Sequence, residues 1–192
     1  MDAFTHLETI IADYGLYFVF LGVFLEGDTV VIVAGFLSHQ GLLNPFAVAG
    51  TAFVGTLIND QGLFFLGRHF SDSRIVRKQK QRPIFAKVLG MIERNSNVFI
   101  LAFRFLYGLR TVSPLALGVS NVPASRYLLL NVIAAAIWAP AVTGIGYCLG
   151  LALHGTIGDL PKIEHKIAAA LAIAVLSAIV IHLIARRVRR AT

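Results

Sequence analysis

The sequence predicts an all-α integral membrane protein, in which a re-entrant helical hairpin followed by a transmembrane helix occurs twice as an inverted repeat. Hydrophobic residues make up 57% of the 192 residues and charged residues only 14%, whereas a soluble domain carries about 25% charged residues. The mean hydropathy is +0.75. An amphipathic N-terminal helix and a C-terminal transmembrane helix complete this single predicted membrane domain.

The first predicted elements are a short interfacial helix at residues 1–13 and two uncharged arms, 14–25 and 29–39. Each arm reaches only about 17 Å at 1.5 Å per residue, whereas the hydrocarbon core of a bilayer is roughly 30 Å thick. Placed in line, the two arms could cross the membrane once; folded back on each other, they would form a re-entrant hairpin with the charges at its tip. Gly27 permits the sharp break between them.

A spanning helix over 46–67, interrupted at Asn59-Asp60, is expected to complete the first repeat, residues 14–67. Residues 68–94 form a basic loop that holds eight of the 17 lysines and arginines. Positive residues in short loops stay in the cytoplasm, so we place this loop there, with an amphipathic helix at 84–92.

The second repeat, residues 95–153, has the same order of elements. Two short apolar arms, broken by Gly108 and Pro114, precede the uncharged stretch 127–153, which is long enough for a full span. Glycines 32 residues apart follow a hairpin and close a span in both halves: Gly35 with Gly67, and Gly118 with Gly150.

The last predicted span, 167–185, leads into a basic tail that we also place in the cytoplasm. The number of crossings between the basic loop and this tail must then be even, so the second hairpin leaves and returns on the cytoplasmic side. The first hairpin enters from the opposite side. Short, interrupted apolar segments at matching positions of two halves indicate a transporter site near the membrane midplane.

Four charged residues lie at the centres of the two hairpins: Glu26, Asp28, Arg104 and Arg110. A charge at membrane depth costs roughly 2.5–3.5 kcal/mol, so such residues indicate a functional site. Non-helical backbone is tolerated at this depth only inside protein or around a wet cavity. We therefore expect the acids to face the arginines across a small polar chamber.

Arginines in such a chamber suit a phosphate, because the planar guanidinium group can bind two oxygens at once. A carboxyl group at membrane depth can be neutral or charged near pH 7, since burial favours the neutral form and a nearby arginine the charged form. This predicts a proton-linked switch in which Glu26 and Asp28 hold or release the arginines, with Asp60 as a third candidate. The alternatives are acids that only cap or bridge the fold, arginines that reach the cytoplasmic surface, and an Asp60 that bonds only to backbone near Asn59.

The sequence contains no pattern for a metal site, a cofactor or an enzyme. The histidines lack metal-ligand spacing with another histidine, cysteine or acid, and there is no nucleophile–base set or glycine-rich phosphate loop. The basic residues flank apolar spans and do not alternate with aromatic residues, which argues against nucleic acid. The predicted partners are a lipid phosphate, protons and anionic lipids at the cytoplasmic face, and a homo-oligomer is left open.

Ordered motifs over residues 14–153 resemble the DedA family, also called the SNARE-associated or VTT-domain family. The Arg-x5-Arg hairpin is the most specific of them. The motifs are Phe24-Leu25-Glu26-Gly27-Asp28-Thr29, Gly55-Thr56-Leu57-Ile58-Asn59-Asp60-Gln61, Arg104-Phe105-Leu106-Tyr107-Gly108-Leu109-Arg110, and Trp138 with Gly146-Tyr147-Cys148-Leu149-Gly150.

This resemblance implies a bacterial inner-membrane transporter with two re-entrant hairpins, linked to moving polyprenyl phosphate or phospholipid and to the proton motive force. It assigns essential roles to Glu26, Asp28, Arg104 and Arg110. The chain departs from the family pattern where Asn59 replaces a glycine before Asp60. It departs again where Gly27 alone separates two acids that many members place further apart.

We therefore interpret the chain as a transporter that moves a lipid phosphate, such as an undecaprenyl-phosphate-like carrier or a phospholipid, across the bacterial inner membrane. Arg104 and Arg110 would bind the headgroup, and Glu26, Asp28 and Asp60 would couple protons. One alternative is a proton-coupled antiporter for small cations or drugs, with the acids as the substrate site. Another is a membrane scaffold without transport.

Overall fold

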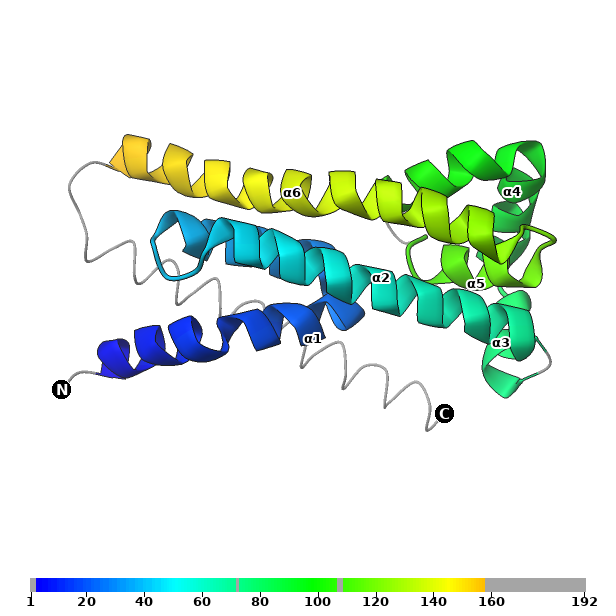
Figure 1. The fold of residues 1–192 in the computed structure, drawn as a ribbon, viewed down its shortest axis with the longest axis horizontal. Coiled ribbons are helices and arrows are strands. Elements are labelled where there is room, and N and C mark those ends of the chain that lie inside the picture. Colours follow the sequence, from blue (N-terminus) through cyan, green and yellow to red (C-terminus); the bar gives the residue numbers. More distant parts are fainter. Residues whose placement is uncertain (1–2, 72, 107–108, 158–192) are drawn as a thin grey trace. The chain divides into compact units, whose positions relative to one another are not determined.

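The computed structural model describes residues 3–71, 73–106 and 109–157, and all regular elements in these ranges are helices (Figure 1). By length and composition, two of them could cross a membrane, at Asp13–His39 and Ala124–Ala152. These observations confirm an all-helical fold with candidate membrane spans. The predicted last span and the basic tail lie outside the described residues.

The described chain divides into two compact units. Unit 1 holds the residues up to Gly55 and those from Ala139 onward, and unit 2 is Thr56–Trp138. Two long helices, α2 at Pro45–His69 and α6 at Ala124–Ile157, contribute residues to both units.

Helix α1, Ala3–His39, turns back on itself in unit 1 (Figure 1). Its one non-helical residue is Glu26, with φ −142° and ψ 50°. A Cβ added at Gly22 would lie 2.6 Å from Val30 Cγ1, although residues eight apart in a straight helix are separated by about 12 Å. The two arms therefore pack against each other as a helical hairpin.

Two details of α1 differ from the sequence prediction. The break falls on Glu26 and not on Gly27, and among the described residues positive φ occurs at Gly41 alone. No break separates the predicted interfacial helix from the first arm either, since the helix runs from Ala3 to the Glu26 bend. Helix propagation is cooperative, so a mere change of composition near residue 14 does not end it.

Helix α2 begins after a turn in which Gly41 has a φ of 78°. The side chain of Asn44 caps the helix, accepting hydrogen bonds from the backbone N–H groups of Phe46 at 2.9 Å and Ala47 at 3.2 Å. The predicted interruption at Asn59-Asp60 is wrong, because α2 is continuous to His69. The Asp60 carboxylate pairs with an arginine, so it does not compete for the helix backbone.

Unit 2 holds four shorter elements between α2 and α6. The predicted basic loop is largely helical, and the amphipathic helix expected within it is the first part of α4. A non-helical residue, Asn95, divides that part of α4 from the first arm of the second hairpin. The elements are α3 at Arg74–Lys80, α4 at Pro83–Ala102, the 3-10 turn η1 at Phe103–Phe105, and α5 at Val112–Val119.

The second hairpin packs the end of α4 and η1 against α5, with Ile100, Phe103, Leu115 and Ala116 buried in one apolar core. Pro114, which the sequence predicted as a break, lies in the first turn of α5. Proline is tolerated there because the first-turn N–H groups have no partner within the helix. Gly108, the other predicted break, lies outside the described residues.

The same glycine crossing occurs once in each unit. In both units an arm of a hairpin crosses a long helix, and each of the two elements has a glycine at the crossing. A Cβ added to one glycine would collide with a backbone carbonyl oxygen of the opposite element. That oxygen belongs to the residue three positions before the opposite glycine. In unit 1 Gly35 meets Thr143 O and Gly146 meets Ile32 O, and in unit 2 Gly67 meets Leu115 O and Gly118 meets Phe64 O.

Three of the four glycines that are spaced 32 residues apart in the sequence take part in these crossings: Gly35, Gly67 and Gly118. The fourth crossing glycine is Gly146, whereas Gly150 packs against the side chain of His39. The even 32-residue spacing in both halves did not identify the contact, because a helix carries several small residues and its rotation selects which one meets the partner.

Candidate functional site

Arg104 is the centre of a buried polar cluster in unit 2. Its Nη2 lies 2.6 Å from Asp60 Oδ2, and both side chains are fully buried. The same guanidinium group donates to Thr56 Oγ1 and Asn131 Oδ1, each at 2.8 Å. Side chains from α2, η1 and α6 therefore surround one charge.

The η1 turn explains how an arginine enters an apolar core. Phe103 is fully buried in that core, whereas Phe105, two residues on, is 59% exposed. Arg104 lies between them and is buried on the side of the turn that meets α2 and α6. A buried charge with a paired carboxylate is tolerated, whereas removing one partner costs about 3–5 kcal/mol.

Arg110, which follows the second hairpin's bend, contacts both a hydroxyl group and an aromatic ring. Its Nη2 donates to Thr56 Oγ1 at 2.7 Å. Its guanidinium carbon lies 4.2 Å from the centre of the Trp138 ring, within the range of a cation–π interaction. Arg104 lies farther from the same ring, at 6.0 Å.

Thr56 joins the two arginines, because its single hydroxyl oxygen accepts a hydrogen bond from each. Two like charges are thereby held side by side, and Asp60 forms an ion pair with one of them, Arg104. Two adjacent guanidinium groups can donate to several oxygens of one phosphate. The cluster therefore has the charge and donor geometry of an anion site.

Further polar groups surround the arginines. Asn131 accepts from Arg104 through its Oδ1, and within the part of the chain that is described its buried Nδ2 has no hydrogen-bond partner. That amide is a donor beside the guanidinium group. Tyr127 donates through its hydroxyl to the backbone oxygen of Asp60 at 3.3 Å, and its ring stacks on Phe64 at 4.2 Å. These contacts align α6 with α2 within unit 2.

Arg68 has a separate, structural position at the other end of the second hairpin. Its guanidinium group donates to the carbonyl oxygens of Gly118, Ser120 and Val122 at 2.6–2.9 Å. These carbonyls end α5 and lead into α6, so Arg68 takes the place of a helix C-cap. It ties α2 to the exit of the hairpin.

The structure brings together three of the predicted site residues: Arg104, Arg110 and Asp60. Asp60 contacts Arg104 through its side chain, so the alternative in which it bonds only to backbone is wrong. Glu26 and Asp28 lie at the bend of α1 in unit 1, and their pairing with the arginines stays a prediction. Within the described ranges, no group of three or more histidine, cysteine or acidic side chains could hold a metal ion.

The sequence prediction missed the contacts that Thr56, Asn131 and Trp138 make with the arginines. Thr56 lies one helical turn before Asp60 and therefore on the same face of α2. Asn131 and Trp138 lie seven residues, or two turns, apart on α6. The sequence did carry a signal for these contacts, namely a polar side chain within an otherwise uncharged span. Such a side chain needs a hydrogen-bond partner when it is buried.

Comparison with known sequences gives a consistent result. The VTT domain matches residues 25–148. The inner membrane protein YohD of Escherichia coli strain K12 is 34% identical over 157 residues, which cover 81% of each chain. The inner membrane protein YghB of the same strain is 27% identical over 131 residues, or 67% of this chain and 60% of YghB. This chain thus spans less than two thirds of YghB.

A more distant relative is the uncharacterized membrane protein slr0232 of Synechocystis, 26% identical over 155 residues, covering 75% of this chain and 71% of slr0232. No solved structure matches the chain.

Proposed function

Because the chain belongs to the VTT domain family, known also as the DedA family, we propose that this membrane protein is a transporter that moves a lipid phosphate across the bilayer. The observation that carries the proposal is the pair of arginines joined at the Thr56 hydroxyl. A phosphate headgroup is the part of a lipid that two adjacent guanidinium groups recognise. The acyl or prenyl tails would stay in the bilayer.

The contacts of the two arginines support different roles. Arg104 donates to Asp60, Thr56 and Asn131, so its orientation is fixed by three side chains. Arg110 is only partly buried and stacks on Trp138. In the proposed mechanism Arg104 supplies a fixed positive charge. Arg110 contacts the headgroup and moves between the phosphate and another acceptor.

Proton coupling is assigned to Glu26 and Asp28 at the bend of the first hairpin. When charged, these acids would hold Arg110, and when protonated they would release it to the headgroup. Asp60 is the constant partner of Arg104 in this scheme, because its carboxylate already forms a fully buried ion pair. The scheme needs only one arginine to change partner in each cycle.

The inverted repeat of re-entrant hairpins forms part of the proposal. It is supported by the bend of α1 at Glu26 and by the glycine crossings that occur in the same form in both units. Relatives named inner membrane proteins support a place in the bacterial inner membrane. The basic segment 68–94 would face the cytoplasm and contact anionic lipids there.

A cation antiporter is the second candidate, but the cluster favours it less. A cation site needs carboxylates that are available to the substrate, and Asp60 is engaged with Arg104. Its acids would have to be Glu26 and Asp28 alone. A scaffold without transport would use the same charges only for pairing, so it would tolerate charge-reversing swaps.

The test is translocation of a fluorescent polyprenyl phosphate in proteoliposomes at two pH values. Wild type should move the lipid, Arg110→Ala and Arg104→Ala should abolish movement, and Glu26→Gln should remove its pH dependence. Arg94→Ala is the matched control, because Arg94 is exposed and lies outside the cluster. Full transport by the Arg104→Ala, Arg110→Ala double variant would contradict the proposal. Cation-driven proton movement in lipid-only vesicles would support the antiporter.

A further inference from the structure

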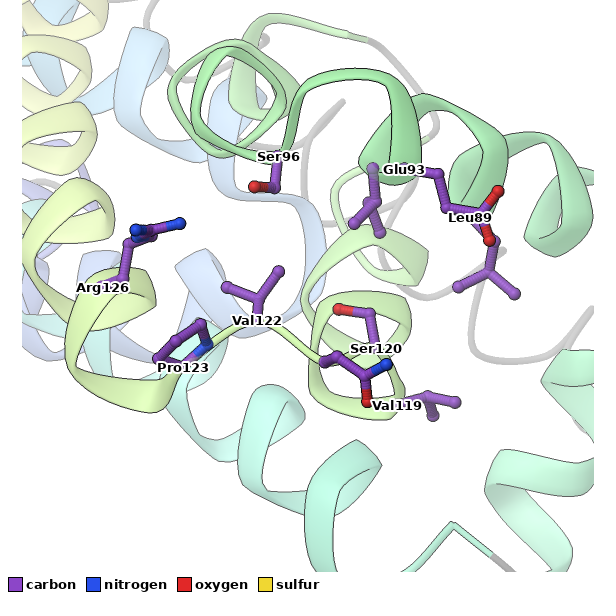
Figure 2. Close-up of a pocket in the computed structure, with 10 residues that line it drawn as sticks. Leu89, Glu93, Ser96, Val119, Ser120, Val122, Pro123 and Arg126 are labelled. Atoms are coloured by element: carbon purple, nitrogen blue, oxygen red, sulfur yellow. The ribbon is translucent and has the colours of Figure 1, made fainter.

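A cavity in unit 2 shares no residue with the arginine cluster. Its volume is about 390 Å³, and it lies between α4, the end of α5 and the start of α6 (Figure 2). One part of its wall is apolar, with Ile92, Val122 and Pro123. Two oppositely charged side chains, Glu93 and Arg126, also line it.

The two charges do not neutralise each other. Figure 2 shows Glu93 on α4 and Arg126 on α6 at opposite sides of the cavity. Both side chains are exposed, and in the described part of the chain neither forms an ion pair within 4.0 Å. The cavity therefore presents a separated positive and negative charge to whatever enters it.

The position of Arg126 places this cavity near the edge of the bilayer. Arg126 lies in the first turn of the candidate span Ala124–Ala152. Leu128 and Leu129 follow it on the surface, 46% and 63% exposed. Apolar side chains of this kind are stable when they face lipid, and an arginine two or three residues before them reaches the headgroup level.

We propose that this cavity binds the headgroup of a zwitterionic phospholipid with a primary ammonium group, that is, a phosphatidylethanolamine. Arg126 binds the phosphate, Glu93 accepts hydrogen bonds from the ammonium group, and the apolar wall covers the glycerol backbone. The separated charges of the site match the separated charges of this headgroup. The site does not depend on the proposed transport function.

The same charges disfavour other headgroups. An anionic phospholipid brings a phosphate without a cation, so Glu93 repels it or remains unmatched. A quaternary choline group has no N–H to donate to the carboxylate or to the nearby hydroxyl of Ser96. Selectivity should therefore depend on Glu93, and overall affinity on Arg126.

The experiment measures binding of short-chain phospholipids to the full-length protein in detergent by native mass spectrometry. The ethanolamine lipid should bind about tenfold more tightly than the choline or glycerol lipid, the scale of one charge-assisted hydrogen bond. Glu93→Gln should erase this preference, and Arg126→Gln should weaken all three lipids about tenfold. Asn97→Ala, at an exposed position of α4 outside the cavity, should change neither.

Two further variants make the result decisive. The double variant Glu93→Arg, Arg126→Glu exchanges the charges and should bind the ethanolamine lipid better than either single reversal. Arg110→Ala should keep lipid binding here while it loses transport, which separates this site from the transport proposal. Thermal unfolding checks that each variant is folded.

Three outcomes would overturn the proposal. One is stronger binding of the glycerol lipid than of the ethanolamine lipid by wild type. A second is an unchanged ethanolamine preference in folded Glu93→Gln. The third is equal affinity for free phosphoethanolamine, since it would mean that the apolar wall and the membrane lipid play no part.

Discussion

Asp60 and Arg104 form a salt bridge of 2.6 Å in which both side chains are fully buried. The two residues come from α2 and from the turn η1 of the second hairpin. Their pair therefore fixes where the hairpin meets the long helix. Removing one partner of the pair is costly, because it leaves a single buried charge. Replacing both partners by apolar side chains costs far less, because no buried charge is left.

Asp60→Ala should destabilise the protein by about 3–5 kcal/mol, since it leaves Arg104 buried without its carboxylate. Thermal unfolding in detergent measures this loss, with Asn59→Ala as the control on the adjacent position. The double variant Asp60→Leu, Arg104→Met should recover most of the stability but not transport. An unfolding temperature of Asp60→Ala equal to wild type would mean that the ion pair does not support the fold.

Thr56→Val should reduce lipid transport at least tenfold, because both arginines lose their shared acceptor and each such hydrogen bond is worth about 1.5–3 kcal/mol. Valine has nearly the shape of threonine, so the packing of α2 is retained. Thr56→Ser keeps the hydroxyl and should retain most of the activity. Equal transport by the valine and serine variants would contradict the bridging role.

Trp138→Leu should weaken the apparent affinity for the lipid substrate by roughly two- to thirtyfold, as expected for loss of a cation–π contact worth about 0.5–2 kcal/mol. The concentration dependence of transport in proteoliposomes gives this value. Trp138→Phe keeps an aromatic face and should lie between the wild type and the leucine variant. The idea fails if the leucine and phenylalanine variants behave alike.

Gly118→Ala and Gly146→Ala should each destabilise the protein by more than about 1 kcal/mol, since the new methyl group meets a backbone carbonyl of the opposing helix. Gly90→Ala is the matched control, because a Cβ there meets nothing within 4 Å. Within α4 it should stabilise by about 0.5–1 kcal/mol. Comparable losses at the two crossing glycines would support the proposed repeat, and a loss at one alone would count against it.

Several features of this protein follow from the sequence by itself. Composition and the uncharged stretches predicted an all-helical membrane protein with long helices over 46–67 and 127–153, where the structure has α2 and α6. Charge in an apolar chain singled out Arg104, Arg110 and Asp60, because burying a charge is costly enough to need a reason. These are local properties, so a single chain segment carries the information.

The tertiary structure decided what those charges contact. Thr56 and Arg104 are 48 positions apart in sequence, and their contact depends on how η1 packs against α2 and not on any periodicity. The same holds for the choice of Gly146 over Gly150 and for the bend at Glu26 beside Gly27. Helix rotation and the close approach of two backbones select one residue among several suitable neighbours, and that choice is made only when the helices pack.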